Sequence, residues 1–85
     1  MSRNARLDFI RTELELAIAF VKVARTKYSM GDRVGGDATR ENAMKAYWEA
    51  LRFSKMLSPQ DSSNKALTVL RTEVEAEIKT LYPPH

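Results

Sequence analysis

The apolar positions of residues 7–28 recur at the spacing of an α-helix. One stripe advances by steps of 3, 4, 3, 4, 3 and 4 residues and consists of Leu7, Ile10, Leu14, Ala17, Val21, Ala24 and Tyr28. A second set lies nearly opposite the first, at about 100° per residue. That second set consists of Phe9, Leu16, Phe20 and Val23. The pattern predicts a helix over residues 3–29 that is apolar on two sides and needs neighbours on both.

A second helical pattern covers residues 38–57. The members of its main apolar face are Ala43, Ala46, Tyr47, Ala50, Phe53, Ser54 and Leu57. Small residues at the centre of this face, Ala43 and Ala50, should let the first helix approach closely. Met44, Trp48 and Leu51 extend the apolar arc sideways.

Residues 30–37 separate these two patterns and read MGDRVGGD. Gly31 suits the left-handed conformation that often ends a helix. The pair Gly35 and Gly36 predicts a flexible connector, with Asp37 or Thr39 as the cap of the second helix.

A third helix is predicted over residues 59–81. Ser58 and Pro59 form a helix-start signal, a capping serine followed by proline at the first helical position. One ordinary apolar stripe follows and consists of Leu67, Leu70, Val74, Ile78 and Leu81. The pair Pro83 and Pro84 prevents continuation, so that residues 82–85 form a short tail.

No alternating Val/Ile/Thr run indicates a β-strand. We therefore predict an all-α protein, a single domain over residues 1–85. With short connections, the three helices should form an up-down-up antiparallel three-helix bundle.

Charge and composition narrow the function classes. The chain has 85 residues, no cysteine and a net charge of +3, with acids interspersed among the bases. No signal peptide is apparent, and the apolar run of residues 16–21 is far shorter than the ~20 residues that span a bilayer. We expect a cytoplasmic protein that binds no membrane, and no specific nucleic acid, because nearby carboxylates repel phosphate.

Catalytic and metal-binding chemistry is not indicated. The only histidine, His85, follows two prolines, and no cysteine accompanies it. Glu73 and Glu77 lie one turn apart, beside basic residues, as is usual for a solvated helix face. The glycines of residues 30–37 have neither the P-loop nor the dinucleotide-binding spacing. We expect no enzyme activity, no cofactor and no bound metal.

The pattern contains more apolar surface than a lone three-helix bundle hides. The surplus residues, our candidates for partner binding, are Phe9, Leu16, Phe20, Val23, Met44 and Trp48. They are expected either to complete the core, or to border one continuous strip or two walls of a groove on the first two helices.

From Leu14 onward the chain resembles the MIT (microtubule-interacting and trafficking) domain. The similarity lies in ELELAIAFVKVA, a glycine-bearing turn, ENAMKAYWEALRFSKML and a leucine-spaced third helix. The set Ala43, Tyr47, Ala50 and Leu51 also resembles the second helix of a tetratricopeptide repeat. The resemblance implies a three-helix bundle that binds short helical or extended peptides in grooves between its helices.

Two functions are consistent with the sequence. The first is a small adaptor module that binds a helical or extended peptide, or a second copy of itself, through an apolar face of the first two helices. The alternative is a small nucleic-acid-associated regulator.

Overall fold

The computed structural model describes residues 2–81, and all regular secondary structure in that range is helical. The helices are α1 (Arg3–Ser29), α2 (Arg33–Ser54), α3 (Pro59–Ser62) and α4 (Lys65–Lys79). The all-α prediction is confirmed, and α1 has the predicted bounds. The predicted count of three helices is wrong for this range, because the expected third helix is divided in two. The predicted tail, with His85, lies outside the described residues.

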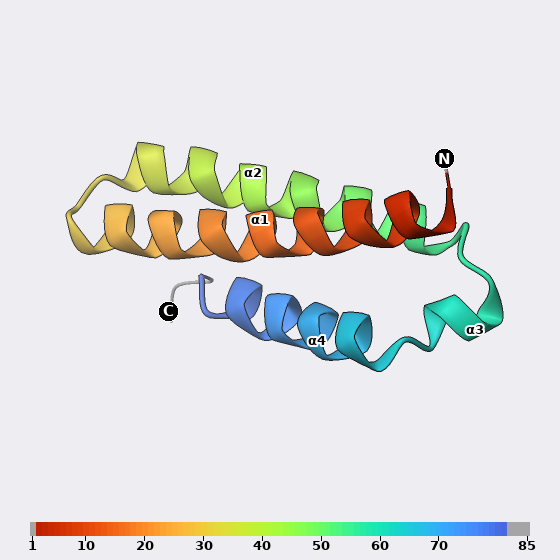
Figure 1. Cartoon of the computed structure of the whole chain (residues 1–85). Helices are drawn as coiled ribbons and strands as arrows, with labels where there is room; N and C mark the ends of the chain where they lie inside the picture. Colours follow the sequence, from red (N-terminus) through yellow and green to blue (C-terminus); the bar gives the residue numbers. More distant parts are fainter. Residues whose placement is uncertain (1, 82–85) are drawn as a thin grey trace.

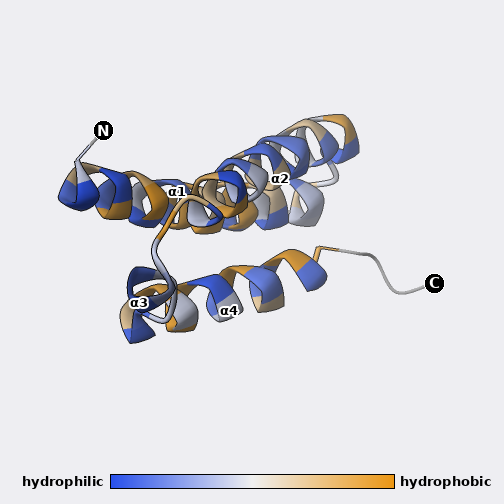
Figure 2. Ribbon diagram, turned by 90° about the vertical axis from the view of Figure 1, so that its right-hand side faces the viewer, coloured by the Kyte–Doolittle hydropathy of each residue, from blue (hydrophilic) through white to orange (hydrophobic). Residues whose placement is uncertain are grey.

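The close packing in the molecule is between α1 and α2, which lie side by side along their lengths (Figure 1). Viewed from the side, these two helices form one layer, and α3 and α4 lie on one face of it (Figure 2). Contact between α4 and α1 is less extensive, and contact between α4 and α2 is smaller still. The fourth helix therefore covers α1 better than it covers α2.

Small residues form the seam between α1 and α2. Ala17 and Ala24 of α1 are fully buried, as are Ala43 and Ala50 of α2. Short side chains let two helix backbones approach closely, because the distance between helix axes depends on the side chains at the contact. The burial of Ala43 and Ala50 agrees with the predicted position of this contact.

The predicted flexible connector of residues 30–37 is wrong in extent, because α2 already begins at Arg33 and only residues 30–32 connect the helices. Gly31 has φ +82°, the predicted left-handed conformation. The backbone N–H groups of Gly31 and Asp32 donate to the carbonyls of Tyr28 and Lys27, the bonding pattern of a Schellman C-cap. Asp32, and neither Asp37 nor Thr39, caps α2 by accepting from the Gly35 N–H at 2.9 Å.

Position 36, within α2, is a glycine because an aromatic ring occupies the space that a side chain would need. A Cβ atom at this position would lie 2.6 Å from ring carbons of Tyr28. The Tyr28 hydroxyl donates to Asp37 at 2.5 Å and holds the ring there. Gly36 therefore serves close packing between α1 and α2, and Gly35 leaves room for the capping Asp32 carboxylate, where the sequence pattern indicated flexibility.

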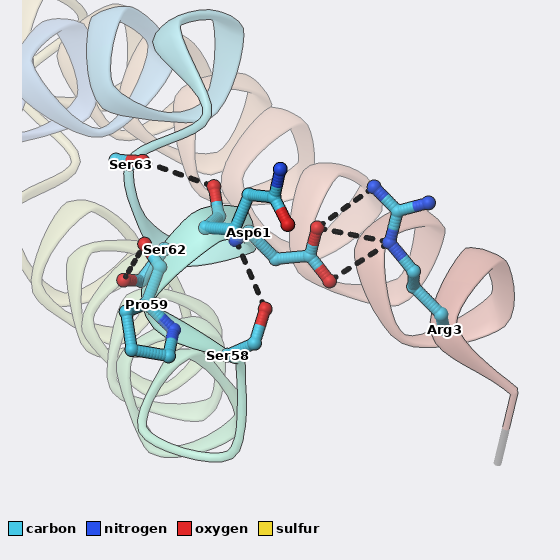
Figure 3. Close-up of polar contacts among 7 residues, drawn as sticks. Arg3, Ser58, Pro59, Asp61, Ser62 and Ser63 are labelled. Carbon is cyan, nitrogen blue, oxygen red and sulfur yellow. Dashed lines mark hydrogen bonds and ion pairs between the residues drawn. The ribbon is translucent and has the colours of Figure 1, made fainter.

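The division of the predicted third helix follows from side chains that compete with helix continuation. Ser58 caps α3 as predicted, accepting from the Asp61 N–H at 3.1 Å (Figure 3). After one turn, the Ser62 and Ser63 hydroxyls donate to carbonyls of that same turn, and Asn64 caps a new helix by accepting from the Leu67 N–H. The second helix also ends earlier than predicted, because α2 stops at Ser54 and not at residue 57.

The core draws on all three long helices. The predicted stripe of α1 supplies its largest share, and α4 contributes Val74 and Ile78, followed by Leu81 after the helix end. Tyr47, at the edge of this core, donates from its hydroxyl to Glu75 of α4. Arg25 of α1 donates to Glu77 at 2.7 Å and to the Thr80 hydroxyl at 2.6 Å. These polar contacts fix the position of α4 on the α1–α2 layer.

Candidate functional site

The six residues predicted to bind a partner differ in exposure. Leu16 is 41% exposed, Val23 46% and Trp48 57%. The other three, Phe9, Phe20 and Met44, are half-buried. The structure does not bring all six together: they lie in three separate places on the molecule.

The first place is a strip of three side chains along α1, which we call the outer strip: Leu16, Phe20 and Val23. Leu16 and Phe20 line a shallow hollow against the edge of α2 formed by Asn42, Lys45, Ala46 and Glu49. Val23 lines the next hollow along α1, together with Lys27 and Met30. In the part of the chain that the structure describes, no helix covers this strip.

Trp48 and Met44 lie elsewhere on α2, one helical turn apart. Neither residue lines the hollow beside Leu16 and Phe20. Trp48 is about 120° around the helix from Asn42, which does line it. The Trp48 ring contacts the ring of Tyr47, with centroids 5.5 Å apart, and Tyr47 in turn contacts α4. Trp48 and Met44 therefore belong to the α4 side of α2.

Phe9 has an intramolecular partner. Its ring packs against the ring of Phe53 on α2, with centroids 4.5 Å apart. The Arg52 guanidinium lies 5.2 Å from the centre of the same Phe53 ring. Phe9 thus helps to fasten α1 to α2, whereas Phe20 and Met44 pack against the buried core.

A pocket of about 290 Å³, which we call the inner pocket, opens where α4 diverges from the α1–α2 layer. Its apolar lining comes from all three long helices and the α2–α3 link: Ile10, Leu14, Ala50, Leu51, Leu57 and Leu67. Trp48 does not line this pocket, but it lies one helical turn from Leu51, which does. At this volume the pocket is at the small end of ligand sites and suits one or two aliphatic side chains better than a cofactor.

The charged residues that line the inner pocket are both basic. Lys55 and Arg71 line it, and no carboxylate does. Arg71 makes only a long ion pair with Glu75, at 3.9 Å, and both side chains are largely exposed. Such a pair contributes little to stability. Both cations are therefore available to an acidic partner at the rim.

Burial perturbs one ionisable group beside this pocket. Burial away from water is the larger cause and the hydrogen bond to Glu75 the second, and together they raise the pKa of Tyr47 to about 12. Tyr47 is therefore a neutral hydroxyl donor at physiological pH. Its hydroxyl donates to the Glu75 carboxylate and so links α2 to α4.

A larger hollow, at the junction of α1 and α3, is a less suitable ligand site because its charges are already paired. Arg3 and Asp61 form an ion pair at 2.8 Å (Figure 3). Arg6 donates to the Met56 carbonyl at 3.1 Å. The hydrogen bonds from Arg3 hold the pKa of Asp61 below its ordinary value. This cluster fastens α3 to the start of α1.

Sequence reasoning missed the inner pocket. Leu57 and Leu67 were expected on the main apolar faces of the second and third helices, and Leu51 on the sideways extension of the second. The pocket lies where the predicted third helix is interrupted and α4 begins at Lys65. The signal that could have indicated it is the run Ser62-Ser63-Asn64, which favours caps and turns over helix interiors.

Within residues 2–81, no group of three or more acidic, histidine or cysteine side chains is placed to hold a metal ion. No helix in that range has the length and apolar character needed to cross a membrane. No protein-family model matches the chain, and no characterised protein or solved structure is significantly similar to it. The resemblance to MIT domains and tetratricopeptide repeats therefore stays a prediction.

Proposed function

We propose that this chain is a small helical interaction module that binds an amphipathic helical peptide at the inner pocket. In this proposal α1, α2 and α4 form an up-down-up bundle, and α3 is the short connecting helix at the end of the bundle where the pocket opens. The function is binding and not catalysis.

The observation that carries the proposal is the combination of an apolar interior and a basic rim. The pocket is lined by leucines, and Lys55 and Arg71 are its only charged lining residues. A matching ligand would insert a leucine-sized side chain and carry carboxylates one turn away, where they meet the rim cations. Trp48, with 57% of its surface exposed, would supply flat contact area next to that anchor.

The expected affinity is modest. One buried aliphatic anchor contributes about 1.5–3 kcal/mol, and each exposed ion pair about 0–1 kcal/mol. Together these contributions reach about 5 kcal/mol at most before the entropy of association is subtracted, so we expect a dissociation constant in the millimolar range. An adaptor of this strength works with other contacts or at high local concentration.

The nucleic-acid alternative has less support. Arg3, Arg11, Arg25 and Arg52 each form an ion pair with a carboxylate of the same chain. Carboxylates next to cations repel the phosphate backbone and reduce the counterion release that drives binding.

Fluorescence of Trp48, the only tryptophan, provides the test. We expect a helical peptide with a leucine stripe flanked by glutamates to shift the emission to shorter wavelength and to saturate. The same peptide with lysines in place of the glutamates should bind more weakly.

Charge variants identify the rim. Lys55→Glu combined with Arg71→Gln should reverse the preference between the two peptides. The control, Lys22→Glu combined with Lys79→Gln, changes the net charge equally at exposed positions outside the inner pocket and should leave the preference unchanged. Equal responses of the two variants would show that only net charge matters and would refute the proposed site.

A further inference from the structure

The outer strip of α1 lies on another side of the molecule from the inner pocket and has its own charge pattern. Glu13 lies seven residues before Phe20, and Lys27 lies seven residues after it. Seven residues are almost two full helical turns, so that all three side chains share one face of α1. Glu13 lines the hollow beside Leu16, and Lys27 lines the hollow beside Val23.

Neither flanking charge is neutralised within the described chain. Glu13 and Lys27 are both half-buried, yet neither forms an ion pair with another residue of the range 2–81. Nearby acids and bases, by contrast, do pair along α1, as Arg11 does with Asp8 at 3.2 Å. The hollow beside Leu16 also contains Lys45 and Glu49, and the hollow beside Val23 also contains Lys22 and Asp32. The strip therefore presents apolar area between one hollow whose lining is net negative and one whose lining is net positive.

This arrangement is complementary to itself. If a second α1 lies antiparallel with Phe20 at the centre, each Glu13 faces the Lys27 of the other copy, about 10 Å to either side of Phe20. A parallel alignment would place acid against acid and base against base. Two-fold symmetric interfaces require such self-complementarity, whereas an unrelated partner has no reason to match this spacing.

We propose that the chain forms a two-fold dimer through the outer strip, with the two α1 helices antiparallel and Phe20 at the symmetry axis. The inference goes beyond the peptide-binding function and does not depend on it, since the inner pocket stays free in the dimer.

The dimer is a weak one. The strip from Glu13 to Lys27 is about 21 Å long, at 1.5 Å per residue. Even with the neighbouring edge of α2, it offers less than the ~800 Å² per partner of a standard stable interface. Association therefore depends on protein concentration and, because the flanking pairs are exposed, weakens as salt rises.

Sedimentation equilibrium over a wide range of concentration tests this arrangement with charge reversals that leave the core intact. Glu13→Lys alone and Lys27→Glu alone each place like charges opposite one another at both ends of the strip. Each should weaken the dimer about tenfold. The double variant, Glu13→Lys with Lys27→Glu, should restore it.

Mixing provides the sharpest comparison. The two single variants should each be largely monomeric but should form a heterodimer when mixed, because both ends of the strip then pair acid with base. Glu73→Lys, an exposed reversal on α4, is the control and should sediment as the wild type does. Circular dichroism confirms that every variant is folded. A wild type that stays monomeric at all concentrations, or single variants that dimerise as strongly as wild type, would overturn the proposal.

Discussion

The contact between Gly36 and Tyr28 leads to a prediction whose sign depends on the packing between α1 and α2. Gly36→Ala would normally stabilise a helix interior by about 1 kcal/mol, because alanine is the better helix former. Here the added Cβ would lie 2.6 Å from the Tyr28 ring, which must then move and lose its hydrogen bond to Asp37. Overpacking of this kind costs about 1–3 kcal/mol. We expect a net loss of roughly 0–2 kcal/mol.

A double-mutant cycle separates the two contributions. In a Tyr28→Ala background the ring is absent, and Gly36→Ala should stabilise the protein by about 1 kcal/mol. In a Tyr28→Phe background the ring remains, and the substitution should still destabilise. Urea unfolding followed by circular dichroism measures each free energy of unfolding. If Gly36→Ala stabilises the wild type as much as it stabilises the Tyr28→Ala variant, the ring does not lie over Gly36 and the account of the connector is wrong.

Three further predictions concern stability. Ala50→Leu should overpack the seam between α1 and α2 and lower the free energy of unfolding by about 1–3 kcal/mol, whereas Ala76→Leu at an exposed position of α4 should not; an unchanged melting transition for Ala50→Leu would place the seam elsewhere. The hydrogen bond from Tyr47 stabilises the fold fully below pH 10, the ordinary tyrosine pKa, and its contribution should be lost as the pH rises toward about 12, the pKa of Tyr47 in the folded chain. Tyr47→Phe should lower the free energy of unfolding by about 1 kcal/mol at neutral pH and make it less dependent on pH in the alkaline range. Because the pKa of Asp61 is lowered in the folded chain, the ionised carboxylate contributes to stability above the ordinary aspartate pKa, and this contribution should be lost as the pH falls below it. Asp61→Asn should remove this part of the acid sensitivity, as measured by urea unfolding at several pH values.

The hydrophobic pattern predicted the long helices and most of the core. Ile10, Leu14 and Val21 recur at helical spacing and are buried as expected, because burial of apolar surface is the dominant force and its period is visible in the sequence. Helix ends were less predictable. Asp32, Asp37 and Thr39 are all acceptable caps by residue type, and the sequence does not show that Gly36 packs against the Tyr28 ring within a helix that Asp32 caps.

The candidate site was less predictable than the fold because it depends on relations between helices. The surplus of apolar residues was visible, but the sequence could not show that Leu16 of α1 lies against one edge of α2 while Trp48 of α2 lies on the other side of that helix. Nor could it show that one extra helix break at Ser63 opens a pocket lined by core leucines. The charge pattern of Glu13 and Lys27 was present in the sequence throughout. It gained meaning only when α2 and α4 were seen to leave both charges unpaired.

Amide chemical-shift mapping by nuclear magnetic resonance shows residue by residue whether the inner pocket binds a peptide. The ¹⁵N-labelled chain would be titrated with the leucine-and-glutamate peptide described above. We predict saturable shifts at the amides of Leu51, Lys55, Thr68 and Arg71, with little change at Leu16 and Val23. Saturable shifts confined to the outer strip, or no saturable shift at the pocket residues at millimolar peptide, would contradict the claim.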